Sequence, residues 1–125
     1  MDYNWCTANE YGGYCLGYNH LLNMAATYSH DIVEMDFYNI KQLGFNATSW
    51  WLLPDGQGIT YDDDGLATGI DDEFITNMRD MFELARKTDI AIIPALVPHG
   101  TANNNGQGGN GLTPSEIYNK YFRYM

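Results

Sequence analysis

The chain has 125 residues, which is enough for one domain with a modest hydrophobic core. Its formal net charge is −10 and its 6 basic residues are scattered, so we expect it to bind neither nucleic acid nor an anionic membrane surface. Charged residues make up 18% and aromatic residues 14% of the chain, which excludes the polar, aromatic-poor composition of disordered proteins.

Targeting signals give little guidance on localisation. No apolar run approaches the roughly 20 residues of a membrane span, and the first residues lack the basic and apolar regions of a secretory signal. Cys6 and Cys15 fit either a small-loop disulfide or two free thiols, so the cysteines leave the redox compartment open.

The N-terminal part predicts a strand, a loop and the start of a helix. Residues 1–13 are rich in Tyr, Asn and Gly without a clear period, so we expect an irregular segment. Tyr14–Tyr18 fits a short first strand, and His20 follows it in a loop. Asp31 is then predicted to be a helix N-cap, with Glu34 three residues later completing a capping box.

The clearest stretch is the end of this helix and the strand after it. Apolar residues recur at helical spacing at Val33, Phe37, Ile40 and Leu43. Gly44 suits the positive φ of a helix C-terminus. The aromatic-rich run 47–53 predicts a buried second strand, which the turn-forming Pro54-Asp55-Gly56 ends.

Residues 54–70 are expected to form a long loop around Asp62-Asp63-Asp64-Gly65. Clustered carboxylates are ligands that calcium prefers, but the alternating spacing and terminal Glu of a helix–loop–helix calcium site are missing. We therefore interpret this segment as a solvated acidic turn and predict no metal site.

A second helix is predicted to begin at the N-cap Asp71, with acidic residues in its first turn and Arg86-Lys87 in its last. Its apolar face comprises Phe74, Ile75, Met78, Met81, Phe82 and Ala85. Ile90–Val97 predicts a third strand that is covered on both faces, in which Pro94 indicates a bulge or the strand's end. A Gly/Asn-rich loop over 98–112 and a helix starting at Thr113 follow.

Strands that alternate with amphipathic helices indicate an α/β fold with a parallel sheet. The links Leu43–Ala47 and Lys87–Ile90 after the helices are short, whereas the loops after the strands are long. This asymmetry is typical of a (β/α)8 TIM-type barrel, whose active site lies on the strand-to-helix loops. The alternative is a doubly wound sheet, but Tyr18–Leu21 after the first predicted strand lacks the Gly-rich turn of its nucleotide-binding form.

Several motifs go beyond this pattern. The segments Asp36–Ala47, Trp50–Leu52, Asp55-Gly56, Asp64–Asp71 and Glu83–Leu96 resemble the first helix, second strand and following units of the cellulase/mannanase-type glycoside hydrolases of clan A. The resemblance covers roughly Tyr14 to His99. Many members carry an arginine just before the aromatic pair of the second strand, where this chain has Ser49.

The resemblance implies that residues 1–125 form one partial barrel domain, the first three βα units of a (β/α)8 glycoside hydrolase that acts on β-linked polysaccharide. In this clan two carboxylates on the fourth and seventh strands perform the chemistry. We therefore expect no catalytic residue in this chain and no hydrolysis by the chain alone. Secretion or cell-surface display is what the family implies, and no cofactor is expected.

Four residues are candidates for sugar binding: Trp51, His99, His20 and Asp55. Trp51 lies near the predicted barrel mouth, where its ring can stack on a sugar or pack in the core. His99 and His20 follow predicted strands and can hydrogen-bond a sugar hydroxyl or simply the loop backbone. Asp55 can accept from sugar hydroxyls, although its Pro-Asp-Gly context favours a turn.

Two alternatives belong to other functional classes. The first is a non-catalytic carbohydrate-binding or self-assembling half-barrel, a homo-oligomer in which copies cover one another's exposed strand edges. It predicts sugar affinity or self-association without hydrolysis. The second, ranked below it, is a doubly wound nucleotide or flavin binder, which predicts phosphate contacts in the loop after the first strand.

Overall fold

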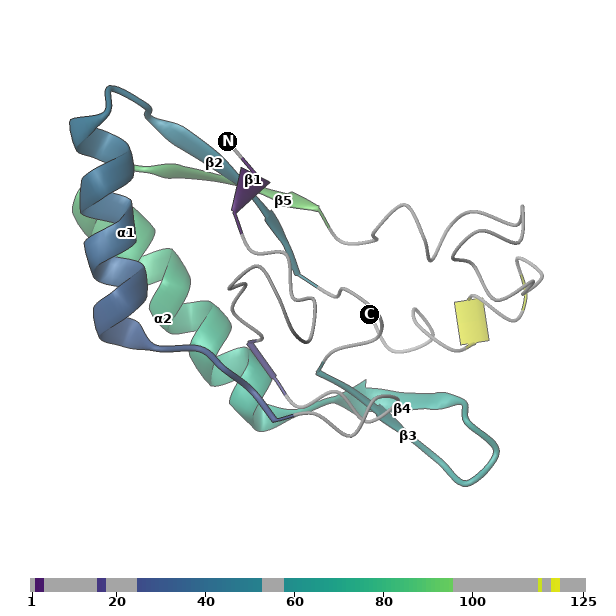
Figure 1. Ribbon diagram of the computed structural model, residues 1–125. Coiled ribbons are helices and arrows are strands. Elements are labelled where there is room, and N and C mark those ends of the chain that lie inside the picture. The colour runs from purple at the N-terminus through teal and green to yellow at the C-terminus, as the bar shows by residue number, and fades with distance from the viewer. Residues whose placement is uncertain are drawn as a thin grey trace.

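The computed structural model describes residues 2–3, 16–17, 25–52, 58–95, 115 and 118–119. Figure 1 shows a mixed α/β arrangement, with α1 and α2 side by side and the strands beside them. The helices are α1 (His30–Gln42) and α2 (Asp72–Thr88). The strands are β1 (Asp2–Tyr3), β2 (Ala47–Trp51), β3 (Ile59–Tyr61), β4 (Ala67–Ile70) and β5 (Ala91–Ala95).

The main sheet has the strand order β1-β2-β5, and both pairings are parallel. Asp2 pairs with Ser49, and β2 pairs with β5 in unbroken register from Ala47 opposite Ala91 to Trp51 opposite Ala95. Helix α1 precedes β2 and helix α2 precedes β5 along the chain. The predicted α/β fold with a parallel sheet is therefore confirmed in the described residues.

Both helices end in the same hydrogen-bonded turn, which feeds a strand at once. At the end of α1, Gly44 has φ of +88°, its N–H donates to Lys41 O at 3.0 Å, and Phe45 N–H donates to Ile40 O at 3.2 Å. This pair of bonds is the Schellman motif, and it confirms Gly44 as the residue that ends α1. At the end of α2, Asp89 takes the same left-handed conformation with φ of 56°.

The two helix ends are also tied to each other. Lys41 Nζ donates to the backbone oxygen of Asp89 at 2.9 Å and pairs with its carboxylate at 2.6 Å. Ala91 N–H then donates to Asn46 O at 2.8 Å, just as the strands begin. These contacts start β2 and β5 side by side, and the unbroken register follows from that common start.

The two helix starts differ in how well they were predicted. Asp71 caps α2 as expected, with its Oδ1 accepting from Phe74 N–H at 2.6 Å. The predicted N-cap Asp31 is wrong, because α1 begins two residues earlier at the N-cap Ser29. Asp31 instead lies in the first turn, where a negative charge still favours the helix dipole.

The core lies between the helix pair and the parallel sheet. Its side chains are Leu16, Val33, Phe37, Ile40, Trp50, Leu52, Ile59, Ala67, Phe74, Met81, Leu84, Ala85 and Ile90. The rings of Phe37 and Trp50 meet edge to face, with centroids 6.1 Å apart. Leu43 and Phe82, both predicted to face the core, are 70% and 40% exposed instead.

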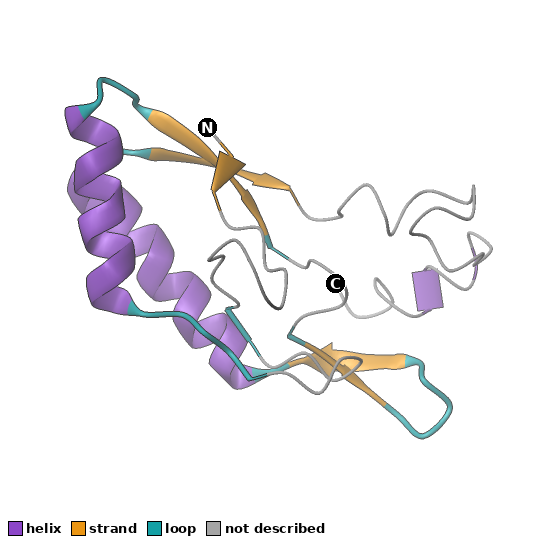
Figure 2. Ribbon diagram, in the orientation of Figure 1, coloured by secondary structure: helices purple, strands orange, loops and turns teal. Residues whose placement is uncertain are grey.

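The segment predicted as a long loop contains a hairpin. Strands β3 and β4 pair antiparallel, with Ile59 opposite Ile70, and Figure 2 shows the hairpin projecting from the rest of the chain. At its tip, Asp62 Oδ1 accepts from Asp64 N–H at 3.1 Å and from Leu66 N–H at 2.8 Å. The acidic run therefore forms a turn, as the solvated-turn interpretation predicts.

Two strand predictions need correction. The first strand is Asp2–Tyr3, within the segment expected to be irregular, whereas Leu16-Gly17 of the predicted strand forms a bend. The predicted third strand corresponds to β5, which ends one residue after Pro94 and has no bulge. It is not covered on both faces, because Ile93 is 60% exposed where no described element packs on it.

Candidate functional site

The carboxyl edge of the parallel sheet carries the candidate site. Strands β2 and β5 end together, since Trp51 pairs with Ala95 and Leu52 N–H donates to Ala95 O at 2.9 Å. Asp55 and His99 each follow four residues after these strand ends. Because both connections leave from neighbouring strands at one edge, the two loops begin side by side.

Of the four candidate sugar-binding residues, the structure describes the backbone of Trp51. Trp51 is the last residue of β2, two residues before the predicted end of the strand at 53, and its side chain lies outside the described residues. Asp55, His99 and His20 also lie outside them. For His20 the positional argument changes, because Leu16-Gly17 of the strand predicted before it forms a bend.

The neighbouring positions on β2 show two distinct faces. Thr48 and Trp50 are buried on the side of the helices. Ser49 is half-buried on the other side, next to the exposed Ile93 in the pairing register. No described element covers this second face at Ile93.

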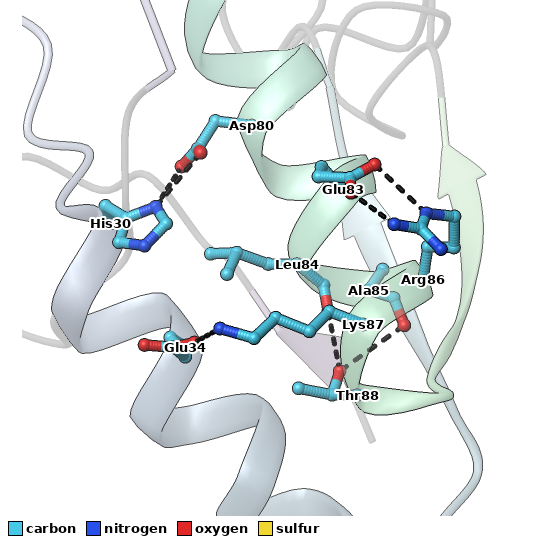
Figure 3. Close-up of polar contacts among 9 residues, drawn as sticks. All are labelled: His30, Glu34, Asp80, Glu83, Leu84, Ala85, Arg86, Lys87 and Thr88. Carbon is cyan, nitrogen blue, oxygen red and sulfur yellow. Dashed lines mark hydrogen bonds and ion pairs between the residues drawn. The ribbon is translucent and has the colours of Figure 1, made fainter.

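The helix layer contains a polar cluster that the sequence did not indicate. Asp80 on α2 accepts from Tyr28 Oη at 2.5 Å and lies 2.8 Å from His30 Nδ1. Figure 3 shows His30 and Asp80 facing each other across the two helices, with the Glu34–Lys87 ion pair below them. The cluster ties the start of α1 and the segment before it to the middle of α2.

Its electrostatics follow from the shared carboxylate. The hydrogen bond to Asp80 raises the pKa of His30, against a smaller desolvation effect, and Asp80, Glu34 and Asp31 add favourable charge. Burial, followed by the hydrogen bond to Asp80, raises the pKa of Tyr28. The imidazole and phenol therefore hold their protons at neutral pH better than free side chains do. About 50 residues separate the partners, so no local spacing signalled the cluster.

This cluster predicts a pH-dependent stability. The pKa of His30 is higher in the folded than in the unfolded chain. Its protonation therefore stabilises the fold below the unfolded pKa near 6.5, and this stabilisation is lost as pH rises through the folded pKa. We expect the free energy of unfolding, measured in urea from mildly acidic to mildly alkaline pH, to fall across this range. His30→Gln should flatten the fall. An unchanged pH profile in this variant would contradict the prediction, because His20 and His99 would then account for it.

The described parts of the chain contain neither a metal-binding cluster nor a membrane-spanning helix. In them no group of three or more His, Cys, Asp or Glu side chains gathers to hold a metal ion. No described helix is both long and apolar enough to cross a membrane. Comparison with known proteins gives no match to a family model, a curated protein or a solved structure.

Proposed function

We propose that this chain is the N-terminal part of a (β/α)8 barrel that acts on β-linked polysaccharide, and that the carboxyl edge of its sheet contacts the sugar. The strands of the parallel sheet lie side by side in the order β1-β2-β5, with a helix before each of the last two strands, and this arrangement supports the proposal. So do the connections of the parallel sheet. Those after β1 (4–29) and β2 (52–71, which contains the β3–β4 hairpin) are long, whereas those after the helices (43–46 and 89–90) are short.

The shared end of β2 and β5 carries the proposal. The loop that contains Asp55 begins there beside the loop that contains His99, and Trp51 is the last residue of β2. An indole ring offers an apolar face to the C–H groups of a sugar, while imidazole and carboxylate groups bond its hydroxyls. In this assignment Trp51 supplies the stacking platform, and His99, Asp55 and His20 supply polar contacts.

The proposed contribution is binding and not bond cleavage. Glycoside hydrolysis needs two carboxyl groups about 5 Å or about 6.5–9.5 Å apart across the scissile bond. The resemblance assigns that pair to the fourth and seventh strands of a barrel. Glu34 and Glu83 of this chain are on the helices, in ion pairs with Lys87 and Arg86.

Sugar binding provides the test. We expect the full chain to bind a soluble β-linked oligosaccharide, such as cellohexaose or mannohexaose, in isothermal titration calorimetry. Trp51→Ala should weaken this binding about tenfold, the limit of an aromatic contact worth roughly 1.5 kcal/mol. Phe82→Ala is the matched control, because that ring is 40% exposed on α2, away from the sheet edge.

Two results would contradict the proposal. One is the absence of heat with either oligosaccharide, and the other is equal binding by the Trp51→Ala and wild-type chains. Release of reducing ends by the chain alone would overturn the assignment of the catalytic carboxylates to other strands.

The exposed Ile93 favours a second candidate, a non-catalytic half-barrel that assembles through its sheet. In such an assembly, the sheet of a second copy would cover this side chain and pair with the open strand edges. This candidate predicts an oligomer by light scattering, which Ile93→Lys dissociates, and sugar binding without hydrolysis.

A further inference from the structure

Helix α2 holds the connection between β1 and α1 at two points, and the first is Asn77. Its Nδ2 donates to Leu16 O at 2.6 Å, although 61 residues separate the two. Leu16 is fully buried in the core, and a Cβ added to Gly17 would lie 2.7 Å from Phe74 Cβ. The hydrogen bond from Asn77 therefore fixes a piece of the connection that packs closely on the same helix (Figure 1).

The second point is Asp80, three residues further along α2. Its carboxylate accepts from Tyr28 Oη at 2.5 Å and lies 2.8 Å from His30 Nδ1, and Figure 3 shows the histidine facing it. Three residues correspond to a rise of about 4.5 Å along a helix, so Asn77 and Asp80 lie on one side of α2 within a single turn. These two neighbouring side chains therefore hold the connection on both sides of residues 18–27.

The connection after β1 also touches the connection after β2. A Cβ added to Gly17 would lie 3.0 Å from Gly58 Cα, so the two backbones lie against each other near the start of α2. His20 follows Gly17 by three residues, and Asp55 precedes Gly58 by three. Three residues of chain reach about 11 Å at most, so two of the proposed sugar contacts are tethered to this one point.

We propose that Asn77 and Asp80 are positioning residues, which hold the connection after β1 in the conformation that presents His20 to the sugar. They act through the connection and not on the sugar itself. Anchoring the connection beforehand lowers the ordering cost of binding. A chain that lacks one anchor populates the binding conformation less, and its apparent affinity falls in proportion. This inference rests on the proposed sugar binding, in which His20 supplies a polar contact.

Isothermal titration calorimetry of the full chain with cellohexaose or mannohexaose tests both anchors. We expect Asn77→Ala and Asp80→Ala each to weaken binding at least threefold. Asp80→Asn keeps an oxygen that accepts a hydrogen bond, so it should lose less than Asp80→Ala. Asn39→Ala is the matched control, because it makes the same change at an exposed position of α1 and should leave the affinity unchanged. The midpoint of urea unfolding shows that each variant is folded under the conditions of the titration.

The same titrations in a His20→Ala chain separate positioning from a general loss of stability. If the anchors act through His20, removing either of them should have little further effect in this background. Equal losses with and without His20, or wild-type affinity in both alanine variants, would overturn this inference and leave the proposed function intact. A wild-type chain that binds neither oligosaccharide would overturn the proposed function, and the positioning role with it.

Discussion

Replacing Trp50 by alanine is expected to lower the free energy of unfolding by about 3–5 kcal/mol. Trp50 is the largest fully buried side chain of the described core, and it packs edge to face on Phe37 of α1. It thus joins the central strand of the parallel sheet to the helix layer. Truncation removes this apolar burial and leaves a cavity that the paired strands cannot close. A domain has only about 5–15 kcal/mol of stability, so the loss is a large part of it.

Urea unfolding followed by circular dichroism measures this loss, and two further variants serve as comparisons. Trp50→Phe keeps an aromatic ring and should lose less than the alanine variant. Phe82→Ala removes an exposed ring of α2 and should change stability by only about 0.5 kcal/mol. If Trp50→Ala costs no more than Phe82→Ala, Trp50 does not anchor the sheet on the helices.

Replacing Gly58 by alanine is expected to cost about 2–4 kcal/mol, the sum of backbone strain and overpacking. Gly58 has φ of +72°, which disfavours any residue with a Cβ. An added Cβ would also lie 2.6 Å from Phe74 Cγ and 2.8 Å from Phe74 Cβ. The second atom is fixed to α2 and cannot move aside. The backbone itself is held by Asp71 N–H, which donates to Gly58 O at 2.8 Å.

Gly65 provides a matched control for this substitution. Its φ is +74°, nearly the same, but nothing lies within 4 Å of an added Cβ. Gly65→Ala should therefore cost only the strain, about 1 kcal/mol. The difference between the two variants measures the packing of Gly58 on Phe74 alone. Equal losses in the two urea titrations would show that this packing contributes nothing.

Local sequence signals predicted the helix ends well. Gly44 ends α1 because a residue there must take positive φ, and Asp71 starts α2 because its carboxylate reaches the Phe74 N–H. Both depend on residues at most five positions apart. The N-cap of α1 was misplaced because Asp31 and Glu34 fit a capping box, whereas the helix starts at Ser29, which makes no side-chain cap hydrogen bond.

Contacts between distant segments could not be predicted from the sequence. The β3–β4 hairpin has strands too short for a visible alternation, and it forms because Ile59 and Ala67 are buried on the core. The pairing of Asp2 with Ser49 has no local signal either. For the candidate site, the sequence predicted Trp51 inside a strand over 47–53, whereas in the structure the strand ends at Trp51, which pairs with Ala95.

The sequence by itself determined the elements whose signals are local: two amphipathic helices, their terminal turns and the strands that follow them. It therefore also determined the parallel α/β class, because helices alternating with strands leave few other arrangements. Only the tertiary structure decided which strand comes first, which helix faces stay exposed, and that Tyr28 and His30 share Asp80. The physical reason is that burial and long-range pairing depend on which surfaces meet, and no residue's neighbours in the chain specify that.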